Sequence, residues 1–282
     1  MGCFQSIPQI DMNFTFEREI EIQNNISKHG DLTLCVFPSG EFVLHSAFSP
    51  VTWFDLNGSV LSTLHGVQSI SLSGFYLFCL CIDVVQILDS QAKLLRIVNL
   101  PLNIAPEEVA FSKIISAENS DDYLIQRQSW STPLLAFDSF GTETSIYNGD
   151  DEDAFYVPEW STFSHIYCNV DVHMRNGNSL LHKTLCFDPN VKSFVVIDQN
   201  VILVLDWFGF VRIHKIHKNE MKIPISETSL NSPNYHIIKP KATQFKNVTS
   251  MGVKKTITSH LELYLLQNDK ISIHSIRSLL VK

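Results

Sequence analysis

The stretch QSISLSGFYLFCLCIDVVQILDSQAKLLRIVNL, residues 68–100, decides the fold class of this chain. It contains four short apolar runs in succession, separated by turn-forming residues at Ser73-Gly74, at Asp83 and in the SQAK segment at 90–93. The runs have the length of strands, are rich in Val, Ile, Leu and Phe, and lack a helical period. The stretch therefore predicts a unit of four antiparallel strands.

The same pattern of short apolar runs separated by turn-forming residues recurs along the rest of the chain. One unit precedes the stretch at LTLCVFPSGEFVLHSAFSPVTWFDLNGSVLSTLHG, and others follow it, the last being QFKNVTSMGVKKTITSHLELYLLQNDKISIHSI, which gives five clear units besides the N-terminal FTFEREIEI. Asn57-Gly58 is expected to form a two-residue hairpin turn, and Asn176-Gly177 and Asn268-Asp269 mark turns of a similar kind.

Units of roughly forty to fifty residues with about four strands each have the period of propeller blades. We therefore predict an all-β fold, a degenerate β-propeller with six or seven blades and WD-repeat-like architecture. The propeller is expected to occupy residues 14–282, behind a flexible segment at 1–13. The N-terminal strand FTFEREIEI, residues 14–22, would complete the last blade. A pair of β-sandwiches is the alternative.

The repeat signature departs from that of WD repeats. No unit joins a Gly-His start to a terminal Trp-Asp, and Asp206-Trp207 has the reverse order. This puts WD-repeat ancestry in doubt and leaves the predicted architecture unchanged.

The composition excludes several classes of protein. The 282 residues are 45% hydrophobic, enough for a sizeable core, and the formal net charge of −8 argues against nucleic acid as a partner. No run reaches the ~20 apolar residues that span a bilayer, and the N-terminus lacks the order of a secretory signal. The cysteines are thinly spread and expected to be reduced: Cys3, Cys35, Cys79, Cys81, Cys168 and Cys186. We expect a cytoplasmic protein.

No catalytic motif is present: the sequence has no nucleophile elbow, P-loop, dinucleotide-binding fingerprint or zinc-protease motif. Cys79 and Cys81 would share one face of a strand, but no second pair or nearby histidine completes a tetrahedral metal site. His214 and His217 lie in the alternating segment FVRIHKIHK, which sends them to opposite faces. Three more histidines are interpreted as strand-edge or pore-lining groups: His165, His173 and His182. We predict a protein that is not an enzyme and has no cofactor and no metal.

The segment NGDDEDAFY concentrates acidic residues at one place: Asp150, Asp151, Glu152 and Asp153. It lacks the spacing of a calcium loop, so a solvated loop between blades is the simpler interpretation, and as a docking site for a basic partner it is the best charged candidate. The four tryptophans are expected to wedge between blades: Trp53, Trp130, Trp160 and Trp207. An exposed one would become an interface anchor.

The N-terminal MGCFQS fits the pattern for N-myristoylation at Gly2, and Cys3 beside it could carry a palmitoyl chain. One acyl chain binds membranes only marginally and two anchor a protein stably. Because short patterns of this kind arise by chance, we favour an unmodified terminus.

The order of the units resembles the N-terminal propeller of the class C vacuolar protein sorting subunit that the HOPS and CORVET tethering complexes share. The similarity lies in strands and turns, in FTFEREIEI, LTLCVFPSGEFVLHSA, VTWFDLNGSVLSTL, residues 68–101 and VILVLDWFGFVRIHKI. Members of that family continue into a long α-solenoid, whereas this chain ends at SIRSLLVK, as a propeller-only fragment or isoform would. The resemblance implies no catalytic residues.

The leading functional prediction is a non-enzymatic protein–protein interaction scaffold, a subunit or fragment of an endolysosomal vesicle-tethering complex in intracellular protein transport. Its partners would be other protein subunits, with possible peripheral association on endosomal or lysosomal (vacuolar) membranes. The alternative is a propeller scaffold in a nuclear or other regulatory multiprotein complex.

Overall fold

The computed structural model describes the following residues of the chain: 10–22, 32–46, 49–82, 84–100, 113–116, 123–126, 134–137, 143–147, 154–157, 162–167, 169–176, 179–186, 191–198, 201–215, 241–255 and 261–280.

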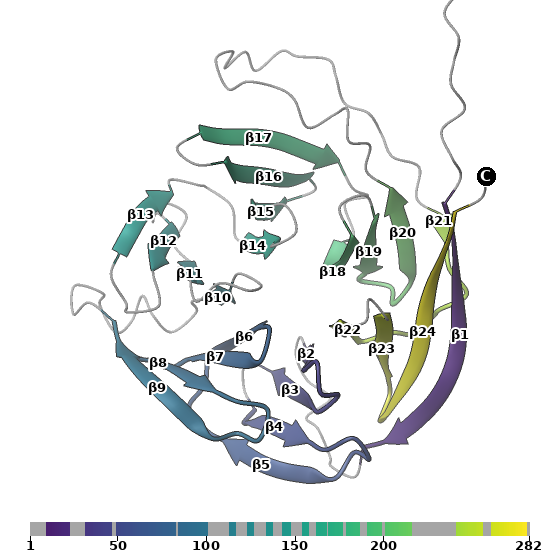
Figure 1. Cartoon of the computed structure of the whole chain (residues 1–282), viewed down its shortest axis with the longest axis horizontal. Helices are drawn as coiled ribbons and strands as arrows, with labels where there is room; N and C mark the ends of the chain where they lie inside the picture. Colours follow the sequence, from purple (N-terminus) through teal and green to yellow (C-terminus); the bar gives the residue numbers. More distant parts are fainter. Residues whose placement is uncertain are drawn as a thin grey trace, which may run out of the picture.

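The strands of this described part form six four-stranded antiparallel sheets, arranged around a ring (Figure 1). The first two sheets are β2 (Leu32–Val36), β3 (Phe42–Ser46), β4 (Val51–Phe54) and β5 (Val60–Leu64), then β6 (Ser69–Ser73), β7 (Tyr76–Leu80), β8 (Val84–Leu88) and β9 (Leu94–Asn99). The next two are β10 (Lys113–Ser116), β11 (Tyr123–Gln126), β12 (Leu134–Phe137) and β13 (Glu143–Tyr147), then β14 (Ala154–Val157), β15 (Thr162–Tyr167), β16 (Asn169–Asn176) and β17 (Ser179–Cys186). The fifth is β18 (Val191–Asp198), β19 (Val201–Asp206), β20 (Val211–Lys215) and β21 (Lys241–Ala242).

The sixth sheet closes the ring with strands from both ends of the chain. Its order is β1 (Ile10–Glu21), β24 (Lys270–Leu280), β23 (Leu261–Gln267) and β22 (Ser250–Lys255). β1 pairs with β24 in a register that runs from Ile10–Leu280 to Glu21–Lys270. The prediction that the N-terminal strand completes the last blade is confirmed. The strand begins at Ile10, ahead of the predicted boundary at Phe14, because Met12 already packs in the core.

In each sheet one strand lies nearest the centre of the ring and the others follow outward, as in a propeller blade (Figure 1). The protein is therefore an all-β propeller, as predicted, and not a pair of sandwiches. The six sheets fall within the predicted range of blades.

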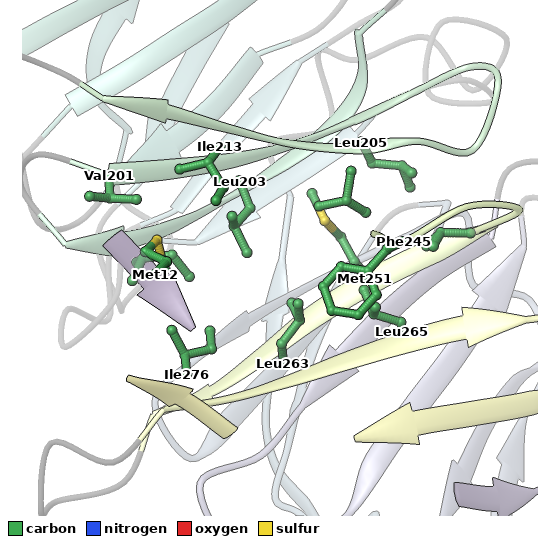
Figure 2. Packing of buried hydrophobic residues seen from close by; sticks show 13 residues of the cluster. Met12, Val201, Leu203, Leu205, Ile213, Phe245, Met251, Leu263, Leu265 and Ile276 are labelled. Carbon is green, nitrogen blue, oxygen red and sulfur yellow. The ribbon is translucent and has the colours of Figure 1, made fainter. Parts of the chain in front are cut away.

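The hydrophobic cores lie between neighbouring sheets, because a single four-stranded sheet cannot cover its own faces. Trp53 of β4 is fully buried in a cluster with Leu77 and Cys79 of β7. A second cluster, shown in Figure 2, joins the fifth and sixth sheets through Leu203, Met251 and other apolar side chains. Where the side chains are described, a blade is thus stabilised by its neighbour around the ring.

The turn at Asn57-Gly58 is longer than predicted. Asp55 and Ser59 form the closing backbone pair, so three residues lie between them, and of these only Gly58 has positive φ. A two-residue type I′ turn needs positive φ at both central residues, which Asn57 does not have. Asn268-Asp269 does connect β23 to β24, with Asn268 at φ 56°.

Candidate interaction surface

Three hairpin turns of the described chain share one hydrogen-bond pattern built on an aspartate. The Asp side chain accepts bonds at Oδ1 from the N–H groups two and four residues later, at 2.8–3.0 Å. The residue three positions on has positive φ and donates its N–H to the aspartate carbonyl. The three turns begin at Asp55, Asp89 and Asp206. Because the second, third and fourth amides after the aspartate all have partners, the pattern holds the loop in one conformation.

The turn after Asp206 is held by further contacts. The buried Asp206 carboxylate also accepts a bond at Oδ2 from Arg212 Nη2 at 3.1 Å. Val248 N–H donates to the carbonyl of Gly209 at 3.0 Å, which joins the turn to the segment leading into β22. A Cβ on Gly209 would lie 3.0–3.1 Å from backbone atoms of Asn247 and Val248, so only glycine permits this approach. The turn is fixed to two sheets at once.

The side chains that this turn carries are aromatic and point away from the core. Trp207 is 56% exposed, Phe208 67% and Phe210 40%. We call these three residues the aromatic tip. The equivalent turn positions elsewhere hold Leu56 or the polar residues Ser90 and Gln91. Exposed aromatic side chains on a rigid support are typical of binding hot spots.

A lysine lies over the aromatic tip. Lys192 Nζ is 5.5 Å from the centroid of the Trp207 ring, within the range of a cation–π interaction. Lys192 is the extra residue of a β-bulge, since Val191 pairs with Asp206 and Ser193 with Leu205. Bulges redirect side chains, and this one brings a cation to the ring.

Other exposed apolar side chains lie on the outer strands of the first two sheets: Val60 and Leu61 on β5, and Leu94, Leu95 and Ile97 on β9. β5 and β9 are the last strands of their sheets, so these side chains have no further strand beside them in the described part of the chain.

The sequence analysis did not identify the aromatic tip as a site. Asp206-Trp207 marked a departure from the WD-repeat signature, and Trp207 was expected to wedge between blades, or to become an interface anchor if it proved exposed. The signal that could have identified it is the order of residues in the turn. An aspartate is followed by two aromatic residues, a glycine and another aromatic residue, between two apolar strands. The same spacing in FDLNGSV and LDSQAKL lacks the aromatic residues.

The predicted sites of lipidation and acidic docking fall outside the described residues. Gly2 and Cys3 precede Ile10, where the description begins. The acidic cluster lies between Tyr147 and Ala154 and comprises Asp150, Asp151, Glu152 and Asp153. Both remain predictions.

The tryptophans do not share one role. Trp53 wedges between two sheets as predicted. Trp207 does not, because it lies on a turn and is exposed, the condition under which a tryptophan was expected to become an interface anchor. Trp130 and Trp160 lie outside the described residues.

Three cysteines lie in or against the cluster that contains Trp53. Burial raises the pKa of the Cys35 thiol to about 12. The pKa of Cys79 is also well above its usual value, first because of burial and then because of Cys81 and Cys35. Thiols with raised pKa are poor nucleophiles and poor metal ligands at neutral pH. Within the described ranges, no group of three or more side chains is placed to hold a metal ion.

The predicted histidine positions are spread over several strands. His214 is buried on β20, and His217 lies outside the described residues. Three others lie on strands of the fourth sheet, His165 on β15, His173 on β16 and His182 on β17, and their interpretation as strand-edge or pore-lining groups stays a prediction. Among the described residues, no helix is long and apolar enough to cross a membrane.

The comparisons with known proteins support the fold. No protein-family model matches the sequence, and no curated protein matches it. Many chains of solved structures do match. One is a propeller chain from the crystal structure of a mitotic checkpoint complex, with a TM-score of 0.56 and 12% sequence identity over 98% of each chain. At this identity the similarity concerns the fold alone.

Proposed function

We propose that this propeller is a non-enzymatic protein-interaction scaffold and that the aromatic tip is a principal contact for a partner subunit. The observation that carries the proposal is a cluster of three aromatic side chains that stay exposed on a turn held by hydrogen bonds to two sheets.

A rigid support makes the exposed rings suitable for binding. The three rings offer roughly 300 Å² of apolar surface, which is the size of patch that often marks an interaction site. Covering that surface at ~25 cal/mol per Å² would contribute about 7 kcal/mol before the cost of association. Because the turn is already ordered, little further entropy is lost when a partner binds.

The finer proposal is a subunit or fragment of an endolysosomal vesicle-tethering complex. It rests on the resemblance of the strand and turn order to the class C vacuolar protein sorting subunit. The chain would then be cytoplasmic and reach endosomal or lysosomal membranes through its partners. The second candidate is a scaffold in a regulatory complex. It is favoured by the similar propeller chain of the mitotic checkpoint complex, since that chain too belongs to a complex.

The experiment is quantitative co-purification of the tagged chain from cells. The tip variant W207S/F208Q gives the turn the two residues that the Asp89 turn carries, so the hydrogen-bond pattern is kept. The variant L56S changes the equivalent position of the Asp55 turn and is the matched control. We expect the tip variant to lose at least one stable partner and the control to keep all of them.

An unchanged partner set in W207S/F208Q would contradict the role of the tip. The identity of the partners separates the two candidates, because tethering subunits support the first and subunits of a nuclear complex support the second.

A further inference from the structure

We propose that Asn57 is a site of spontaneous modification, its deamidation to aspartate and isoaspartate, and that the Asp55 turn controls the rate of this reaction. The inference concerns the turn between β4 and β5 and does not depend on the aromatic tip. It rests on the order Asn57-Gly58, on the exposure of Asn57 and on the hydrogen bonds that hold the turn.

The reaction needs only the chain and water. The backbone nitrogen of Gly58 attacks Cγ of the Asn57 side chain and gives its proton to a hydroxide ion, while the side-chain amide takes a proton from water and leaves as ammonia. Water then opens the five-membered succinimide ring. Attack of this water at Cγ gives aspartate, and attack at the main-chain carbonyl carbon gives isoaspartate, in which the chain runs through Cβ and Cγ.

The two residues suit this chemistry. Asparagine is a thermolabile residue, and the attack is intramolecular, so it depends on the nitrogen and Cγ coming together. Glycine in the second position favours the attack, because it has no side chain to shield its nitrogen. Asn57 is exposed to the water that the reaction consumes, whereas Gly58 is buried.

The turn restrains the attacking nitrogen. Gly58 N–H donates to the carbonyl of Asp55 at 3.1 Å, so its proton is withheld from hydroxide as long as this bond lasts. The N–H groups on either side, of Asn57 and Ser59, both donate to Asp55 Oδ1 at 2.8 Å. The reaction therefore requires a local opening of the turn, and the Asp55 carboxylate opposes that opening.

Isoaspartate at this position would disturb the contact between the first and sixth sheets. A Cβ on Gly58 would lie 2.5 Å from Ile20 Cγ2 and 2.7 Å from the carbonyl oxygen of Glu21, so the turn backbone lies directly against the end of β1. Isoaspartate adds one carbon atom to the main chain just before Gly58. In such close packing the turn cannot absorb this atom and keep both its bonds to Asp55 and its approach to β1. Since β1 belongs to the sheet that closes the ring, the modification would weaken the closing contact.

The test compares deamidation at Asn57 in the purified full-length chain with that in the synthetic peptide WFDLNGSVL, residues 53–61, by mass spectrometry of samples incubated at neutral pH. We expect the chain to react about tenfold or more slowly than the peptide, because the turn is open for only a small fraction of the time. D55A should react several-fold faster than the unaltered chain. D89A removes the aspartate of the equivalent turn at Asp89 and is the matched control, which should leave the rate at Asn57 unchanged.

The chain also carries its own references for this measurement. The Asn-Gly pairs Asn148-Gly149 and Asn176-Gly177 appear in the same peptide map, and D55A should leave their rates unchanged. The isoaspartate form, separated by chromatography, should unfold at a temperature lower by about 2 °C or more than N57D, which has the same charge without the extra main-chain atom.

Four results would overturn the inference. Equal rates in the chain and the peptide would show that the turn gives no protection. A rate at Asn57 that D55A does not change would remove Asp55 from its control. Equal acceleration of all three Asn-Gly pairs in D55A would assign the effect to general unfolding of the variant. An isoaspartate form as stable as N57D would show that the turn does not need its close approach to β1.

Discussion

Trp53 and Trp207 are two tryptophans in opposite surroundings, one in the core and one at the surface. Trp53 has no exposed surface and packs between the first two sheets, whereas Trp207 is 56% exposed on its turn. We expect Trp53→Ala to lower the free energy of unfolding by about 3–5 kcal/mol because it leaves a cavity. Trp207→Ala should change it by less than about 1 kcal/mol. Urea denaturation followed by far-UV circular dichroism measures both, and equal losses in the two variants would contradict the assigned positions.

Gly209 and Gly74 allow the backbone and packing roles of glycine to be separated. Both have positive φ, at +81° and +53°, but only Gly209 faces backbone atoms at 3.0–3.1 Å, and Gly74 faces nothing within 4 Å. Gly74→Ala should therefore cost only the backbone strain, about 1–2 kcal/mol. Gly209→Ala should cost clearly more, since the segment at Asn247 must also shift. The same denaturation experiment checks this, and a smaller loss at Gly209 than at Gly74 would refute the close approach.

His274 makes the stability of the sixth sheet depend on pH. Burial lowers the pKa of His274 below its ordinary 6.5, and the ring packs against Phe245 with centroids 4.7 Å apart. The unfolded chain therefore binds a proton at a higher pH than the folded chain does. The stability contributed by the neutral ring is present above pH 6.5 and is lost as the pH falls through the lower folded value.

We therefore expect the free energy of unfolding to fall as the pH drops below 6.5, with a shallower fall in His274→Phe. Denaturation curves at a series of pH values measure both slopes. His45, whose pKa is also lowered chiefly by burial, remains in the variant and accounts for part of the slope that is left. Identical slopes in the two proteins would show that His274 does not titrate in this way.

Among the elements, β1 is the strand that closes the ring, because it joins the sheet formed by the C-terminal strands. It pairs with β24 over the whole length from Ile10 to Glu21, and it contributes Met12 and Ile20 to two different core clusters. Removing it would expose both clusters. It would also make β24 an edge strand, paired with β23 on one side only, and exposed edge strands favour aggregation.

We expect deletion of residues 1–21 to abolish cooperative unfolding and to give aggregated protein in size-exclusion chromatography. Deletion of residues 1–9 is the matched control, because it leaves β1 intact, and it should yield soluble monomer. A soluble, cooperatively folded protein without β1 would contradict the role of the closing sheet.

At the scale of the whole molecule, the membrane recruitment that the tethering proposal requires would occur through the N-terminus or through partners. β1 begins at Ile10 beside Leu280 of β24, so a chain anchored at Gly2 would be tethered from the sheet that closes the ring (Figure 1). We expect the terminus to be unmodified and recruitment to occur through partners. Mass spectrometry of the N-terminal peptide from cells is the measurement, and a myristoyl group on Gly2 would refute this expectation.

The position of a turn could be predicted where the residues of the turn alone determine it. Asn268-Asp269 connects its strands as predicted, and the turn predicted at Ser73-Gly74 lies one residue later, at Gly74-Phe75, because the residues of a turn determine much of its conformation. The turn at Asn57-Gly58 was predicted too short. Its length depends on the side chain of Asp55, which accepts bonds from Asn57 and Ser59 and so stabilises a longer loop. The aromatic tip could be recognised only from the aromatic residues that the turn carries, since the same turn spacing at Asp89 carries polar residues.

The sequence by itself determined the four-strand units, the turns between them and the all-β class, because strand alternation and turn preference act over a few residues. Only the tertiary structure decided that Trp53 is buried and Trp207 exposed, because burial depends on what a neighbouring sheet places against each side chain. It likewise decided the register of β1 on β24, since that pairing joins residues from opposite ends of the chain and no local pattern specifies it.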